Sequence, residues 1–219
     1  MIALALAALV WTAHPSDGVT MTLTREGAAT RLDFDFHGHG GYAIARANVA
    51  LELPPNYQFV MPVRGETAPQ DLELKLIDAS GENVWWLNRR NFTFPREWTT
   101  LRTKKRQIEF AWGPATDRTL RRVAAMEVVV TAGSGGKGTG WFEDPLLEAL
   151  PPTPTEDVRI NGPVATFDAK REVGGLTIEW KTQPSAFTVH VDGTATAHRD
   201  TRFVWLPDAE AKSIRIEGG

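Results

Sequence analysis

Apolar and polar residues alternate at every second position along most of the chain. The alternation is clearest in residues 20–24, 31–36 and 72–78, which read TMTLT, RLDFDF and LELKLID. A period of two places successive side chains on opposite faces, so it predicts half-buried β-strands. Sustained helical periodicity is absent, and glycine and proline turns separate the segments at short intervals. The chain is therefore predicted to be all-β, an antiparallel β-sandwich or barrel.

The most regular pair of predicted strands is residues 72–78 and 84–90. The residues between them, 79–83 (ASGEN), have turn chemistry, so the two strands should form a hairpin. Alternation along the return strand gives it two different faces. One face carries Trp85, Leu87 and Arg89, and the other carries Trp86, Asn88 and Arg90. Further along, residues 120–126 (LRRVAAM) are expected to form a helical turn before a strand at 127–131, and residues 141–147 a closing strand after a glycine-rich loop.

A proline-rich segment, residues 151–156 (PPTPTE), divides the chain. Such a segment is extended and packs poorly, so it predicts a linker. Residues 16–150 then form one large sandwich. Residues 157–219 repeat the β pattern in a second, smaller β-sandwich-like unit that is short for an independent domain. Either this unit leans on the first domain or the chain continues in a longer parent, and the ending in mid-pattern favours the longer parent.

A continuous apolar run, residues 2–11 (IALALAALVW), opens the chain. A membrane span needs about 20 residues, so the run is too short to cross a bilayer but suits a signal peptide. We therefore expect residues 1–15 to be a possible signal segment and the protein to be secreted or periplasmic. No basic residue precedes the run and no clean cleavage site follows it, so a first β-strand or a short buried helix is the alternative.

Composition removes several classes of function. The 219 residues contain no cysteine, which excludes disulfide frameworks, thiolate metal sites and cysteine nucleophiles. The formal net charge of -3 argues against a dedicated nucleic-acid binder, whose domain would be strongly basic. The glycine-rich loop at 133–139 lacks the spacing of a phosphate-binding loop. His37 and His39 lie among glycines without an obvious third metal ligand, so we interpret them as loop histidines.

Tryptophan is concentrated in one part of the chain. Four of the eight tryptophans lie between residues 84 and 112, and seven basic residues lie between 89 and 106. An indole can stack on the C–H face of a sugar ring, while amide and guanidinium groups bind its hydroxyls. The face with Trp86, Asn88 and Arg90 therefore predicts binding of a flat, hydroxyl-bearing ligand, which could also be anionic. The alternatives are core tryptophans with solvated arginines and, less compatible with the overall charge, single-stranded nucleic acid.

Two carboxylates at predicted strand ends form a candidate metal site. Asp17 precedes the first strand and Asp144 lies in the closing strand. The first and last strands of a sandwich are often neighbours. The two carboxylates with backbone carbonyls would then suit a structural Ca²⁺, which takes six to eight oxygen ligands. The alternative is that both are simply solvated.

Four segments carry a resemblance to a known family: residues 71–90, 94–98, 108–114 and 126–144. Their order of strands and turns is similar to the jelly-roll carbohydrate-binding modules of families 11 and 30, and the resemblance covers residues 16–150. It implies a sugar-binding concave face and a structural Ca²⁺ near Asp144, with Asp17 as a looser ligand. The ligand-binding candidates are Trp85, Trp86, Asn88, Arg90, Arg102, Lys104 and Trp112. Arg102 and Lys104 are expected on the adjoining strand, and a slip of one residue would exchange Trp86 for Trp85.

Residues 157–219 resemble the discoidin, or coagulation factor 5/8 C-type, sandwich. The segments that carry this resemblance are 174–180 and 206–216. The unit has about half the length usual for such sandwiches. The tandem resembles the ancillary region of bacterial exported proteins that continue into a glycosidase, which implies that any catalytic domain lies outside these residues.

The expected function is non-catalytic binding of a polysaccharide or oligosaccharide, ancillary to a glycoside hydrolase. No nucleophile-elbow, zinc-protease or related catalytic motif is present. Two alternatives remain open. A glycoside hydrolase or lyase on a jelly roll would need two carboxylates across a cleft beside Trp86. A purely structural β-spacer would have all its tryptophans buried.

Overall fold

The computed structural model describes residues 3–4, 9–151 and 158–218, and it divides into two compact units, Met1–Pro152 and Thr153–Gly219. Both units are built from antiparallel strands, and one short 3₁₀ turn, Lys105–Gln107, is the only helical element among the described residues. The predicted all-β antiparallel fold is confirmed. The boundary between the units falls within the predicted linker, although residues 152–156 of that linker lie outside the described part of the chain.

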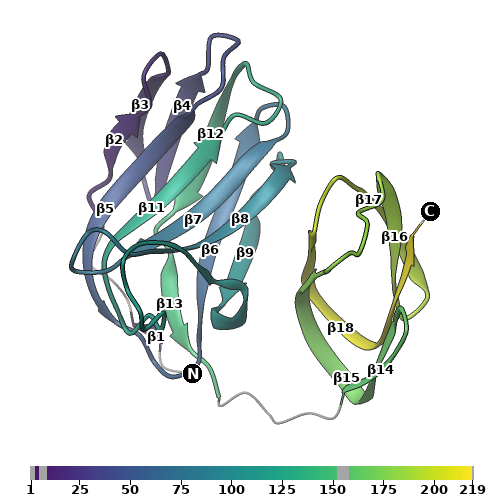
Figure 1. Ribbon diagram of the computed structural model, residues 1–219. Coiled ribbons are helices and arrows are strands. Elements are labelled where there is room, and N and C mark those ends of the chain that lie inside the picture. Colours follow the sequence, from purple (N-terminus) through teal and green to yellow (C-terminus); the bar gives the residue numbers. More distant parts are fainter. Residues whose placement is uncertain (1–2, 5–8, 152–157, 219) are drawn as a thin grey trace. The chain divides into compact units, whose positions relative to one another are not determined.

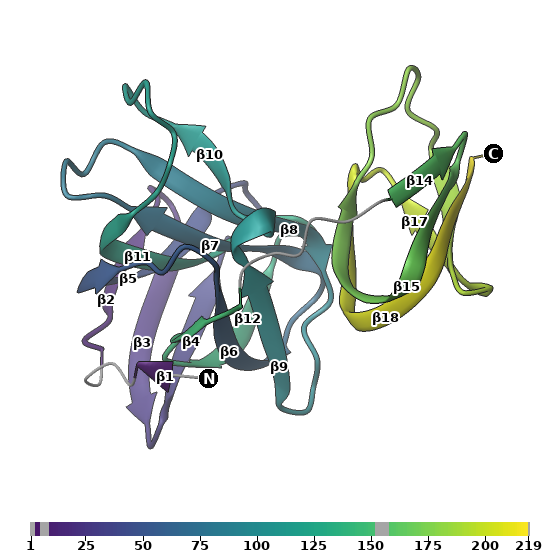
Figure 2. The same ribbon diagram turned by 90° about the horizontal axis from the view of Figure 1, so that it is seen from below.

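Unit 1 consists of two facing antiparallel sheets (Figures 1 and 2). The first, here the β6 sheet, has the order β1-β13-β6-β12-β4-β3, and β9 also pairs with β6. Its strands are β1 (Ala3–Leu4), β13 (Leu146–Ala149), β6 (Tyr57–Glu66), β12 (Lys137–Glu143), β4 (Ala29–Asp35), β3 (Thr20–Glu26) and β9 (Thr99–Lys104).

The second sheet of unit 1, here the β8 sheet, has the order β10-β8-β7-β11-β5-β2. Its strands are β10 (Glu109–Trp112), β8 (Val84–Phe92), β7 (Gln70–Ile77), β11 (Arg122–Thr131), β5 (Tyr42–Glu52) and β2 (Thr12–Pro15). The predicted hairpin is present, because β7 and β8 pair with Leu74 opposite Leu87. Alternation turns one side chain in two towards the space between the sheets, where a cluster including Tyr57, Leu76 and Met126 is almost fully buried.

Two predicted elements differ from the structure for physical reasons. Residues 120–126 do not form a helical turn, because Arg122–Thr131 is one strand. A bulge between Val123 and Ala125 shifts its register, so Val123 and Met126 both point inward and mimic a helical spacing of three. The glycine-rich loop is also shorter than expected, since β12 already begins at Lys137.

Two short strands at the N-terminus belong to the two sheets. Residues 3–4 pair with β13, and residues 12–15 pair with β5. Between them, the Trp11 indole packs edge-on against Phe142 with ring centroids 5.0 Å apart. The other residues of the expected signal segment, 1–2 and 5–8, lie outside the described residues, and export stays a prediction. Within the described residues, no helix is long and apolar enough to cross a membrane.

Unit 2 is a single five-stranded antiparallel sheet with the order β14-β15-β18-β16-β17. Two long strands, β15 and β18, bend along their length, as Figure 1 shows, and register shifts interrupt their pairing. The curled sheet encloses its own core, in which Phe187, Val189 and Val204 are almost fully buried. The bounds are β14 (Val158–Asn161), β15 (Val164–Thr177), β16 (Ala186–Val191), β17 (Thr194–Arg199) and β18 (Phe203–Gly218).

Candidate functional site

Strand β8 has the two faces that alternation predicts. Trp85, Leu87 and Arg89 are buried, Trp86 and Asn88 are half-buried, and Arg90 is exposed. Trp85 packs edge-on against Phe110, and its Nε1 donates a 2.8 Å hydrogen bond to the Arg118 carbonyl. With 5% of its surface exposed, Trp85 is a core residue. The prediction that it binds ligand is therefore wrong.

The strand register places six side chains in one row across the whole β8 sheet. Trp86 lies between Glu109 and Lys75, and Glu127 lies between Lys75 and Arg46 on the following strands. Thr12 of β2 ends the row beside Arg46. The row therefore combines an aromatic ring with alternating charges on the face of the sheet opposite to Leu74 and Leu76.

An aromatic corner stands at the β10 end of this row. The Trp86 and Trp112 rings cross at 80° with centroids 5.7 Å apart, and 47% of Trp112 is exposed. Lys75 Nζ lies 5.4 Å from the Trp112 centroid and 6.0 Å from that of Trp86, so one ammonium group supports both rings by cation–π attraction. We name this group of Trp86, Trp112, Lys75 and Asn88 the Trp86–Trp112 platform.

Asn88 provides the platform with an unsatisfied polar group. Its Oδ1 is buried and has no hydrogen-bond partner, while its Nδ2 lies 3.4 Å from Glu73 Oε1. Glu73 Oε1 also accepts a 3.0 Å hydrogen bond from Thr131, which keeps the carboxylate in place. A buried acceptor without a donor is costly, so a ligand hydroxyl that donates to Asn88 Oδ1 would relieve that cost.

The charges on this face are largely compensated. Lys75 Nζ lies 3.0 Å from Glu73 Oε2, and Arg46 lies 2.9 Å from Glu127 Oε1. Arg90 is the exposed cation next to Asn88 on β8. The electrostatics therefore favour an uncharged ligand over the anionic one that the basic stretch of sequence suggested.

The basic residues between 89 and 106 do not gather on one face. Arg89 points into the sandwich, donates to Arg102 O and Thr103 Oγ1, and has its pKa lowered to about 10 by burial. Arg102 and Lys104 lie on β9, which pairs with β6 in the other sheet. Arg102 is 3.6 Å from Glu148 there, and Lys104 is buried. The expectation that Arg102 and Lys104 adjoin Trp86 in the same sheet is therefore wrong.

The structure does not bring Asp17 and Asp144 together as calcium ligands. Asp17 is exposed in the turn before β3, whereas Asp144 follows β12, which ends opposite Ala29 at the far end of the β3–β4 hairpin. Both Asp144 oxygens already accept protein hydrogen bonds, from Leu9, Trp11 and Arg25. Within the described residues, no group of three or more metal-ligating side chains is found. These residues do not fit the calcium that the resemblance implied.

A separate hollow of about 430 Å³ lies on the β6 sheet. Its walls include Asp33, Asp35 and Glu66 with the hydroxyls of several threonines, and it contains none of the predicted site residues. Burial opposes ionisation of Asp33, but hydrogen bonds from Arg31 and Thr139 hold its pKa below the usual value. Asp33 is thus a paired structural carboxylate.

Sequence reasoning missed the charged half of the β8 face, namely Glu73, Lys75, Glu127 and Arg46. A signal for the first two was present. Alternation that turns Leu72, Leu74 and Leu76 inward must turn Glu73 and Lys75 outward beside Trp86. Glu127 and Arg46 could not be joined to them, because the pairing of β11 with β5 and β7 spans long stretches of sequence.

Comparisons with known proteins yield similarities of fold. No protein-family model matches the chain, and no curated protein matches it. Among solved structures, the family 11 carbohydrate-binding module of a cellulosomal cellulase of Clostridium thermocellum aligns with a TM-score of 0.49 at 10% identity, over 67% of this chain and 90% of that one.

Two further solved structures are similar to this chain. The family 11 module in complex with a β-1,3-1,4-mixed-linked tetrasaccharide has a TM-score of 0.47 at 10% identity, over 65% of this chain and 95% of that one. The family 30 module of another cellulosomal cellulase of the same bacterium has a TM-score of 0.45 at 11% identity, over 65% and 93%. Sequence identities and TM-scores this low indicate a similar arrangement of strands and carry no conclusion about function.

Proposed function

We propose that unit 1 is a non-catalytic carbohydrate-binding module whose ligand lies on the Trp86–Trp112 platform. The observation that carries this proposal is the exposed Trp112 indole, which crosses Trp86 at 80° near Lys75, with the unpartnered Oδ1 of Asn88 two residues along β8 from Trp86. Aromatic surface near an unsatisfied acceptor suits a sugar ring, which has an apolar C–H face and hydroxyl donors at its edge.

Each part of the platform has a defined role in this proposal. Trp112 stacks on the C–H face of a sugar, and Trp86 forms the wall beside it. Asn88 Oδ1 accepts a ligand hydroxyl, and Arg90 can donate to a second one. Because Lys75 and Arg46 are paired with Glu73 and Glu127, the proposed ligand is a neutral polysaccharide or oligosaccharide.

The proposal includes a role for the module beside a glycoside hydrolase. A module of this kind raises the local substrate concentration for a tethered glycoside hydrolase, which is an effective-concentration effect. Such an enzyme would lie in a longer parent chain that is secreted or periplasmic. The discoidin-like character of residues 157–219 stays a prediction.

Specific observations oppose both alternatives, the structural spacer and the hydrolase. A purely structural spacer needs all four tryptophans of residues 84–112 to be buried, but Trp98 and Trp112 are 44% and 47% exposed. A hydrolase needs two available carboxylates near Trp86. Glu109 lies beside Trp86 and is exposed, but Glu73 and Glu127 are each held by a cation, Lys75 or Arg46. A single available carboxylate is therefore present on that face instead of a pair.

Affinity electrophoresis of the full chain in gels containing glucans, xylans or mannans tests the proposal. Trp112→Ala should lose at least about tenfold in affinity for the retarding polysaccharide, which corresponds to about 1.4 kcal/mol. Trp98→Ala is the matched control, since Trp98 is equally exposed and also has a cation, Arg64, over its ring, but it precedes β9 of the other sheet. Its affinity should stay within about twofold of wild type.

Two outcomes would contradict the proposal. One is the absence of retardation by every polysaccharide in the panel. The other is an equal loss in Trp98→Ala and Trp112→Ala, which would move the ligand away from the β8 sheet. Release of reducing sugar by the wild-type chain would favour the hydrolase, and substitution of Glu127 by Gln should then abolish that release.

A further inference from the structure

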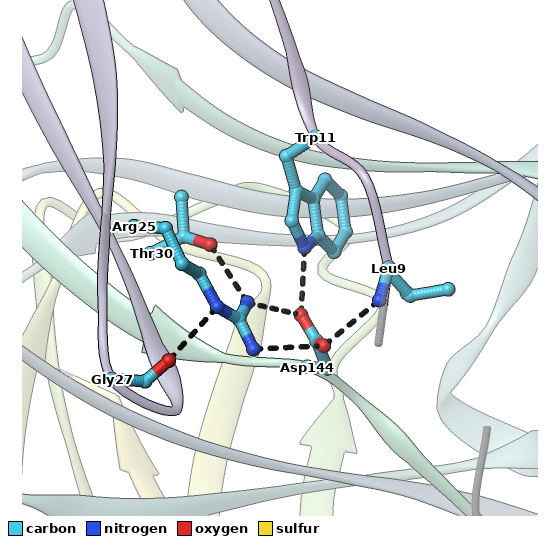
Figure 3. Close-up of polar contacts among 6 residues, drawn as sticks. All are labelled: Leu9, Trp11, Arg25, Gly27, Thr30 and Asp144. Atoms are coloured by element: carbon cyan, nitrogen blue, oxygen red, sulfur yellow. Dashed lines mark hydrogen bonds and ion pairs between the residues drawn. The ribbon is translucent and has the colours of Figure 1, made fainter. Parts of the chain in front are cut away.

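Asp144 is the centre of a closed polar cluster at the end of β12 (Figure 3). Its Oδ1 accepts hydrogen bonds from Trp11 Nε1 at 2.8 Å and from Arg25 at 3.1 Å. Its Oδ2 accepts from the Leu9 backbone N–H at 3.0 Å and from the second Arg25 amino group at 3.3 Å. A carboxylate has about four lone-pair sites, and these four donors fill them.

Arg25 is itself held in a fixed orientation. Its Nε donates to the Gly27 carbonyl at 3.1 Å, and its NH1 also donates to Thr30 Oγ1 at 3.2 Å. Figure 3 shows the guanidinium edge-on to the Asp144 carboxylate, between the β3–β4 turn and the N-terminal segment. A planar, always charged guanidinium matches both carboxylate oxygens at once, which a hydrated ammonium group could not do.

The cluster therefore joins three parts of the chain through one carboxylate. Leu9 and Trp11 belong to the segment before β2, Arg25 belongs to β3, and Asp144 lies between β12 and β13. The pair is partly sheltered, with 19% of the Asp144 side chain and 40% of the Arg25 side chain exposed. A divalent cation at Asp144 would have to displace the guanidinium, and within the described residues it would meet no group of three or more metal-ligating side chains.

We infer that Arg25 is a built-in cation that takes the place of the calcium ion expected at Asp144. The carboxylate that would have bound a metal is instead neutralised within the fold. Unit 1 should then be stable without calcium, and its stability should depend on Arg25.

Thermal unfolding of the full chain, in chelator and in millimolar calcium, tests this inference. The wild-type Tm should agree within about 1 °C in the two buffers, and Arg25→Gln should unfold at least about 4 °C lower in both. Arg122→Gln is the matched control. Arg122 pairs with Glu52 at 2.8 Å, but both side chains are about three-quarters exposed, so its Tm should change by about 1 °C or less.

The inference is overturned if calcium raises the wild-type Tm by several degrees and Asp144→Asn abolishes that rise. It is also overturned if Arg25→Gln unfolds at the same temperature as Arg122→Gln. If Arg25→Gln does not fold, the calcium dependence of Tm in the wild type and in Asp144→Asn still tests the inference, because that comparison does not use Arg25→Gln.

Discussion

At the scale of single residues, the tryptophans of unit 1 differ in what their indole N–H groups bind. Trp85 donates to the Arg118 carbonyl, Trp141 to Glu26 and Trp11 to Asp144. No such bond is made by Trp86, Trp98 or Trp112 within the described residues. Trp86 and Trp112 lie on the outer face of the β8 sheet, whereas Trp98 precedes β9 of the other sheet. An indole N–H that is already used belongs to a structural tryptophan, so three indoles remain available to a ligand, and two of them form the platform.

A histidine in unit 2 predicts a dependence of stability on pH. His198 stacks on Phe187 with ring centroids 5.5 Å apart, its Nε2 is buried without a hydrogen-bond partner, and burial lowers its pKa from 6.5. Below pH 6.5 the unfolded state binds the proton more readily than the folded state. The contribution of neutral His198 to the stability of unit 2 is therefore complete above about pH 7, and it declines as the pH falls through 6.5.

Calorimetry of the full chain at pH 7.5 and 5.5 measures this effect. On acidification the wild type should lose more stability in unit 2 than His198→Gln, which has no group that titrates at this position. An identical loss in both proteins would mean that the His198 ring does not carry the dependence.

At the scale of elements, alternation predicted each strand's faces better than it predicted the partners of the strand. The division of β8 into a Trp85 face and a Trp86 face follows from local sterics alone, and the structure has it. The position of β9 does not follow, because the chain after β8 crosses to the other sheet instead of returning beside it. Along that crossing Phe92 and Phe94 pack edge-on in the interior. Phe94 also lies against Gly65 of β6, a long-range contact that no local pattern encodes.

The crossing between the sheets predicts a sensitive glycine. A Cβ at Gly65 would lie 2.8–2.9 Å from the buried Phe94 side chain, and the Gly65 N–H donates to Pro95 at 2.8 Å. Gly65→Ala should therefore lower the free energy of unfolding by about 1–3 kcal/mol through overpacking. Urea denaturation measures the loss.

Gly40→Ala provides the matched control for this substitution. A Cβ at Gly40 meets no atom within 4 Å, and its backbone does not have a positive φ. The control should unfold within about 0.5 kcal/mol of wild type. Equal stability of the two variants would show that Phe94 has room to move away from Gly65.

At the scale of the whole molecule, the platform and both sheets that support it belong to unit 1. The core of unit 1 contains Tyr57, Leu76 and Met126, whereas that of unit 2 contains Phe187 and Val204, so each unit encloses apolar residues of its own. A chain of residues 1–152 should therefore fold and retain the polysaccharide affinity of the full chain within about threefold. A tenfold loss in affinity electrophoresis would mean that unit 2 contributes to binding.

The whole-molecule charge balance was informative from sequence, but its local distribution was not. A net charge of -3 describes a nearly neutral chain, while seven basic residues within residues 89–106 suggested a basic patch. In the structure, Arg89 points into the interior and Arg90 lies on the β8 face. Arg102 lies on β9, which belongs to the other sheet. Sequence proximity therefore overstated the positive charge that a ligand would meet.

The most direct test of the proposed platform is a titration followed by the indole N–H resonances of the eight tryptophans in a ¹H–¹⁵N NMR spectrum. The titrant is an oligosaccharide of the polysaccharide that retards the chain most. The Trp86 and Trp112 resonances should shift with a common affinity, and those of Trp85 and Trp141, which already donate within the fold, should stay in place. The proposal that the Trp86–Trp112 platform binds carbohydrate would be contradicted if the largest shifts occurred at Trp98 or Trp180. It would also be contradicted if no glucan, xylan or mannan oligosaccharide caused a shift.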